Sequence, residues 1–143
     1  MINLADYRRY IESVARTVPG IKSVVPLSVD ASMADRVGSV SEDDSPTLFF
    51  LVPSAEGKGS TDAWKEENLC VIFVMKRFNP RVSTSFDALV ETQPLVEAVK
   101  SALFDGDYDG CRPLGVDAGT LSTIPETEFF GDWAGWSVAF TAE

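Results

Sequence analysis

The residues best placed to do chemistry in this sequence are three aspartates at alternate positions in the segment DGDYDG, residues 105–110. Carboxylates spaced in this way and followed by glycine can wrap a hard cation, as in the first half of a calcium-binding loop. The second half does not match, because the twelfth position, where a bidentate glutamate is required, is Val116. Asp105, Asp107 and Asp109 therefore form either a cation site or a solvated turn after a helix, where Asp and Gly are favoured anyway.

Two other segments match chemical motifs only in part. The segment GKGS at residues 57–60 lacks the earlier glycine of a phosphate-binding loop, since position 52 is Val, and it precedes a strand rather than a helix. Glu126 and Glu128 would share one face of a strand, as a candidate acid and base. Nothing in the sequence supplies the burial or the charged partner that would shift either pKa. We interpret the first segment as a surface loop and the glutamates as exposed strand carboxylates.

The composition argues against most catalytic chemistry. The 143 residues include no histidine, which removes the commonest general base, the commonest metal ligand and the usual activating partner of a Ser or Cys nucleophile. Cys70 and Cys111 are too few for a disulfide scaffold or a zinc site. We therefore predict no enzymatic activity, with no catalytic residue, resident metal or cofactor. The remaining enzymatic alternative is a histidine-free site built from carboxylates among Asp30, Asp117, Glu126 and Glu128.

The net charge of −10, from 12 basic and 22 acidic residues, restricts the partners. Binding to nucleic acid needs Lys and Arg to displace counterions, and anionic membranes attract basic segments. We therefore expect no direct binding to nucleic acid and no membrane partner. The N-terminus lacks the basic and apolar regions of a signal peptide, which predicts a protein that is not secreted.

Two main helices are expected. Residues 3–18 repeat apolar side chains at steps of three and four and end at a Pro-Gly pair. Residues 86–104 are also mostly helical in pattern, but a proline in the middle of a helix costs about 3 kcal/mol. Because Pro94 falls there, we expect a short helical turn over residues 86–92 and the main helix over residues 94–104.

Uniformly apolar runs predict buried strands over residues 47–52 and 69–75. Residues 21–29 form another strand candidate, and its Pro26 indicates an edge or a bulge. A weak strand is expected around residues 36–40, followed by an acidic loop.

The end of the chain is expected to close the sheet. Residues 129–140 contain five large aromatics in twelve positions. From Trp136 on, large apolar residues alternate with small ones, which is the period of a half-buried strand. We predict a short strand over residues 120–124 and a closing strand over residues 133–141.

The order of these elements favours one α+β domain over residues 1–143. We predict a mainly antiparallel sheet of about four to five strands, with two main helices packed on one face. Residues 53–68 are rich in Gly, Ser and charge. We expect them to form a long mobile loop, because connections of this length inside compact domains are usually functional or disordered.

Five residues are candidates for a protein interface. Trp64 and Lys65 lie in the expected loop, and an exposed tryptophan often anchors an interface. Phe129, Phe130 and Trp133 lie near the turn before the last strand, where core and interface roles are both open.

The layout resembles that of the small α+β proteins at the head-proximal end of long phage tails, the tail terminators and minor tail proteins of that fold. Three features carry the resemblance. An amphipathic N-terminal helix leads directly into a strand, two apolar strands bracket a long loop, and a helix precedes two C-terminal strands. The corresponding segments are residues 3–18, 48–52, 69–75, 94–104, 124–126 and 133–140.

This resemblance implies a structural subunit that self-associates into a ring, commonly a hexamer. Such a ring caps the growing tail tube and offers a docking surface to the head connector, so the partners would be proteins and the location the virion or the host cytoplasm. The alternative is a small ligand- or calcium-binding module that uses Asp105, Asp107 and Asp109.

Overall fold

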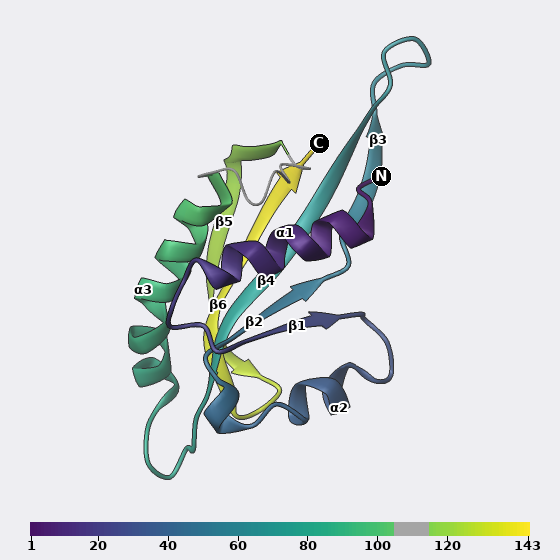
Figure 1. Cartoon of the computed structure of the whole chain (residues 1–143). Coiled ribbons are helices and arrows are strands. Elements are labelled where there is room, and N and C mark those ends of the chain that lie inside the picture. Colours follow the sequence, from purple (N-terminus) through teal and green to yellow (C-terminus); the bar gives the residue numbers. More distant parts are fainter. Residues whose placement is uncertain (105–114) are drawn as a thin grey trace.

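The computed structural model describes residues 1–104 and 115–143 and shows an α+β fold (Figure 1). Six strands form one sheet in the order β1-β2-β4-β6-β5, and β3 pairs with β4 beside this path. The pair β1–β2 is parallel and the other pairs are antiparallel. The strands are β1 (Ser23–Leu27), β2 (Thr47–Leu51), β3 (Ser54–Lys58), β4 (Lys65–Arg77), β5 (Val116–Phe129) and β6 (Trp133–Ala142).

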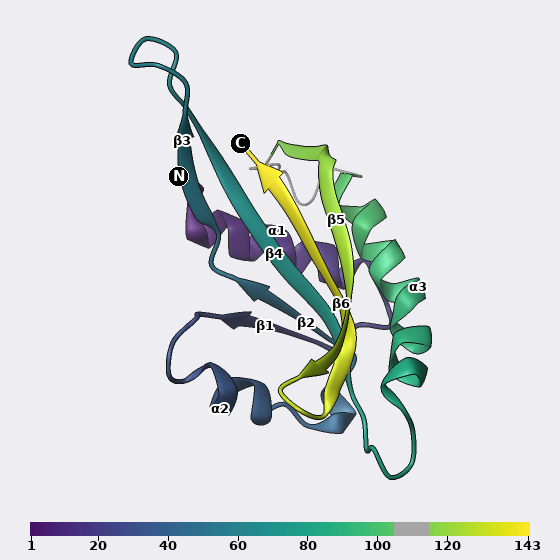
Figure 2. The same cartoon turned by 180° about the vertical axis from the view of Figure 1, so that it is seen from behind.

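Helices cover the two faces of the sheet unequally. Helices α1 (Leu4–Arg16) and α3 (Ser85–Phe104) pack on one face with alternate residues of β2, β4 and β6, which confirms the two main helices on one face. The short helix α2 (Met33–Gly38) packs on the opposite face, over a smaller cluster of residues from β1, β2, β4 and β6. Figure 2 shows that α2 lies at one end of the sheet, away from the hairpin of β3 and β4.

Helix α1 confirms the prediction for residues 3–18. The Asn3 side chain accepts a hydrogen bond from the backbone of Asp6 and so caps the first turn. Tyr10, in the middle of the helix, is buried, and its hydroxyl donates to the Leu103 carbonyl of α3 at 2.6 Å. This bond ties the two main helices together.

Helix α3 is continuous through Pro94, so the expected division into a short turn and a main helix is wrong. Pro94 lies on the exposed side, while Thr92 and Val96 on either side of it are both buried. Packing of both halves against the core therefore keeps the helix continuous and outweighs the free-energy cost of the proline. The indole N–H of Trp136 donates to the Leu89 carbonyl at 3.2 Å, in the turn before Pro94.

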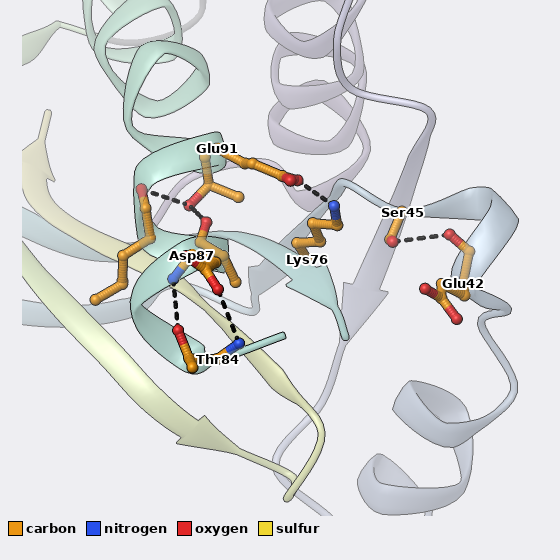
Figure 3. Close-up of polar contacts among 9 residues, drawn as sticks. Glu42, Ser45, Lys76, Thr84, Asp87 and Glu91 are labelled. Carbon is orange, nitrogen blue, oxygen red and sulfur yellow. Dashed lines mark hydrogen bonds and ion pairs between the residues drawn. The ribbon is translucent and has the colours of Figure 1, made fainter. Parts of the chain in front are cut away.

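The start of α3 is fixed by a reciprocal cap. The Thr84 hydroxyl accepts from the Asp87 backbone, and the Asp87 carboxylate accepts from the Thr84 backbone, both at 3.1 Å (Figure 3). One turn later, Glu91 forms an ion pair with Lys76 of β4. The cap fixes where the helix begins, and the ion pair adds one contact between the helix and the sheet.

Residues 36–40 do not form the expected weak strand, because α2 covers most of them. Met33, Val37 and Val40 recur at steps of four and three, which is a helical spacing. They pack against Phe49 and Met75 on the second face of the sheet. The segment has too few apolar residues to distinguish the repeat of a helix from that of a strand.

Residues 53–68 do not form the expected long loop either. Strand β3 pairs with the first five residues of β4, in register from Ser54 opposite Leu69 to Lys58 opposite Lys65. Only residues 59–64 remain as the turn of this hairpin. All β3 side chains are exposed, so the strand needs no apolar run and leaves no hydrophobic signal. This hairpin supplies the sixth strand.

The remaining strands follow the prediction more closely. The strand that contains Pro26 is at the sheet edge, as expected. Strand β5 is longer than the predicted residues 120–124, and its pairing with β6 shifts register twice. Phe130 and Gly131 both take positive φ at the turn before β6.

Gly135 of β6 provides a test of this packing. A Cβ atom there would lie 2.0 Å from the carbonyl oxygen of Val74 and 2.8 Å from the Cα of Met75, and backbone in mid-sheet cannot move aside. Gly135→Ala should lower the free energy of unfolding by about 3 kcal/mol in urea titrations. Gly38→Ala is the matched control, since a Cβ there meets nothing within 4 Å. An equal loss in the two variants would contradict the close approach.

The buried thiol of Cys70 predicts a loss of stability in alkali. Burial raises the pKa of Cys70 to about 11, so the unfolded chain releases this proton first as the pH rises. The free energy of unfolding should therefore fall between about pH 9 and pH 11, by about 3 kcal/mol from this group. Burial also raises the pKa of Tyr7 well above its usual value. Urea titrations of Cys70→Ala should show a shallower decline than the parent, and equal slopes would contradict the assignment.

Candidate protein-interaction surfaces

The hairpin of β3 and β4 projects beyond the rest of the sheet (Figures 1 and 2). Strand β6 pairs with β4 from Asn68 to Arg77, and β2 pairs with it from Ile72 to Met75. The first three residues of β4 therefore pair with β3 alone. We refer to residues 53–68 as the arm.

Trp64 is held in a defined position on the arm although it is 61% exposed. Its indole crosses the hairpin and lies over Gly57, where a Cβ atom would come within 2.6 Å of the indole nitrogen. A larger residue at position 57 would displace the ring from this position. The turn is tight as well, because Gly59 has a φ of +99° and faces the Ala63 carbonyl. The arm therefore presents a large aromatic side chain to solvent, and exposed tryptophans often anchor interfaces.

A polar pocket lies beside the arm, and several of its charged lining residues form ion pairs within the chain. A pocket of about 470 Å³ lies between Lys58, Lys65 and Glu67 of the arm and the ends of β5 and β6. Glu67 is bound to Lys58, which lowers the pKa of Glu67 and raises that of Lys58. Glu66 is bound to the N-terminal amino group of the chain. Lys58, Glu66 and Glu67 of the pocket lining therefore have ionic partners within the chain.

A shallow apolar groove lies at the base of the arm. It has a volume of about 140 Å³ and runs between the first turns of α1 and the ends of β1 and β2. Its rim carries Leu4 and Val52, which are 50% and 53% exposed. Tyr7 and Phe50 form its floor and meet edge to face at 5.9 Å. Arg8 supplies its charged side chain and is bound to Glu12 at 2.9 Å.

The predicted interface residues fall into two groups at opposite ends of β4. Trp64 and Lys65 are on the arm, whereas Trp133 pairs with Arg77 at the other end. The 13 residues of β4 span about 43 Å at 3.3 Å per residue, so the structure does not bring the groups together. Trp64 and Lys65 are exposed.

Of the second group, Trp133 belongs to the core. It is 0% exposed and meets Phe49 edge to face at 5.2 Å. Phe129 is half-buried between Phe49 and Phe73, and Phe130 is 41% exposed at the turn. Only Phe130 of these three offers an aromatic surface to a partner.

The four carboxylates considered for catalysis form no single cluster, because Asp117, Glu126 and Glu128 lie along β5 and Asp30 follows β1. Asp30 accepts from Ser32, Asp117 from the Gly119 backbone, and Glu126 from Ser137. Glu128 is exposed. Asp105, Asp107 and Asp109 of the possible calcium loop lie outside the described residues. Among residues 1–104 and 115–143, no three Asp, Glu or Cys side chains gather closely enough to hold a metal ion.

The structure places Trp64 on the surface, and its interface role stays a prediction, whereas the groove was not predicted from the sequence. The groove forms where α1 meets the ends of two parallel strands, and those segments are distant in the chain. Only Leu4, an apolar residue on the first helical turn, gave a local signal.

Comparison with known proteins leaves the family open. No protein-family model matches the chain, and no curated protein matches its sequence significantly. Within the described part of the chain, no helix has the length and apolar character needed to cross a membrane.

Two tryptophan substitutions should differ in their effect on stability, because one ring is exposed and the other is buried. Trp64→Ala removes a largely exposed ring and should change the free energy of unfolding of the monomer by less than about 0.5 kcal/mol. Trp133→Ala empties a buried site and should cost about 4 kcal/mol. Chemical unfolding of both variants in dilute solution measures the difference. A large cost for Trp64→Ala would show that this ring is a structural part of the monomer.

Proposed function

We propose that this protein is a non-enzymatic assembly subunit that self-associates into a ring, of the tail terminator or minor tail protein type found at the head–tail junction of long-tailed phages. The observation that carries the proposal is the arm, which projects from the sheet and holds Trp64 at its outer end. The ring would act in the virion or the host cytoplasm, with proteins as its partners.

The energetics of the arm support a role in binding. A two-stranded hairpin on its own is marginal in water, because ordering each residue costs about 1–2 kcal/mol. All five residues of β3 are exposed, so the arm buries little apolar surface of its own. A partner that covers Trp64 would supply the burial that the arm lacks. This is the expected property of a segment that works between subunits.

The charge of the chain sets a condition for assembly. Each copy carries −10, so copies repel one another at low ionic strength. Contacts must therefore form through weakly charged, apolar surfaces, and salt should favour them by screening the repulsion.

Mass measurements test the proposal directly. Light scattering behind size-exclusion chromatography should show a mass that rises with protein concentration to a fixed multiple of the chain mass. The multiple should be reached at lower concentration in 500 mM than in 50 mM NaCl, and negative-stain images of that fraction should show closed rings.

A monomer at every protein and salt concentration up to the millimolar range would contradict self-assembly. A dimer that grows no further would contradict the ring while leaving a protein-binding role.

A further inference from the structure

The apolar groove at the base of the arm leaves apolar side chains open to solvent. Its lining is almost entirely apolar, yet Leu4 and Val52 remain about half exposed on its rim. We infer that this groove is the receptor for Trp64 of a second copy of the chain, so that neighbouring copies join arm to groove. The inference rests on the proposed self-association and names the surfaces that carry it.

The two surfaces match in chemistry. An indole ring suits an apolar groove of about 140 Å³ with aromatic side chains in its floor. Arg8 at the rim can lie against an aromatic face, which is a favourable cation–π arrangement. The arm that carries Trp64 is acidic, with four carboxylates against two lysines between residues 53 and 68. Arg8 is the charged residue of the groove lining, and its exposed pair with Glu12 is a weak surface contact that leaves its positive charge able to attract an acidic segment.

The contact cannot form within one molecule. The Trp64 ring lies over Gly57, and the groove begins at Pro53. The strand between these residues spans about 13 Å at 3.3 Å per residue. The pairing of β3 with β4 keeps that strand straight and holds the ring away from the groove of its own chain. The Trp64 that binds in the groove is therefore that of another copy.

An arm-to-groove contact is head to tail, because the two surfaces that meet are different. Each copy has one arm and one groove, so each binds one neighbour on either side. Such contacts continue from copy to copy and close into a ring where the rotation between neighbours allows it.

Complementary variants test this arrangement. Trp64→Ala removes the anchor and keeps the groove, whereas Val52→Glu places a negative charge in the groove and keeps the anchor. Light scattering and analytical ultracentrifugation should show each variant alone associating at least about 30-fold more weakly than the parent. An equimolar mixture retains one good arm and one good groove, and it should give a one-to-one heterodimer that grows no further.

Two matched controls use other exposed apolar side chains of the same chain. Phe86→Ala and Val82→Glu alter side chains that are exposed but belong to neither surface. Both should assemble as the parent does. Circular dichroism and urea unfolding report whether every variant is folded, and Leu4→Ser replaces Val52→Glu in the mixture if the latter is not.

The outcomes separate this inference from the proposed function. If the parent assembles and Trp64→Ala and the groove variant assemble equally well, the arm-to-groove contact is wrong while self-association stands. If both variants lose association but their mixture gives no heterodimer, the arm and the groove do not bind each other, and the inference again fails. If the parent itself never associates, the inference and the proposed self-assembly both fall.

Discussion

The antiparallel ladder between β4 and β6 is the constraint on which the rest of the structure depends. Ten residue pairs join the two strands, from Asn68 opposite Ala142 to Arg77 opposite Trp133. Alternate side chains of this ladder form the core beneath α1 and α3, while Phe73, Met75 and Trp133 on the other face belong to the smaller core beneath α2. Both helical layers are positioned by the same two strands, so a disturbance of the ladder reaches both faces.

The arm follows from the length of β4. The strand begins three residues before its ladder with β6, and this excess pairs only with β3. Asn68 secures the junction, because its side chain donates to the Ala142 carbonyl and accepts from the Ile2 backbone. The arm therefore leaves the body from a fixed base that holds both chain ends. A rigid base lets a short hairpin carry an aromatic to a defined place, which lowers the entropic cost of binding.

Most of the fold could be predicted because the buried strands and α1 have strong local patterns. The predictions were wrong where contacts between distant segments determine the local structure. Pro94 indicated a break, but burial on both sides of it keeps α3 continuous. The arm was taken for a loop, because strands exposed on both faces carry no apolar alternation. For the candidate site, the type and setting of Trp64 were readable, while the groove depends on three segments that only the tertiary structure brings together.

The central claim is that Trp64 passes from solvent into a protein contact when the chain assembles. Of the three tryptophans, Trp133 is buried and Trp136 half-buried, so quenching of fluorescence by a neutral solute reports mainly on Trp64. Acrylamide quenching measured over a dilution series, with the mass recorded for each sample, tests the claim most directly. The account predicts that quenching falls as the mass rises and that the two changes share one midpoint. Quenching that stays constant while the mass increases would contradict it.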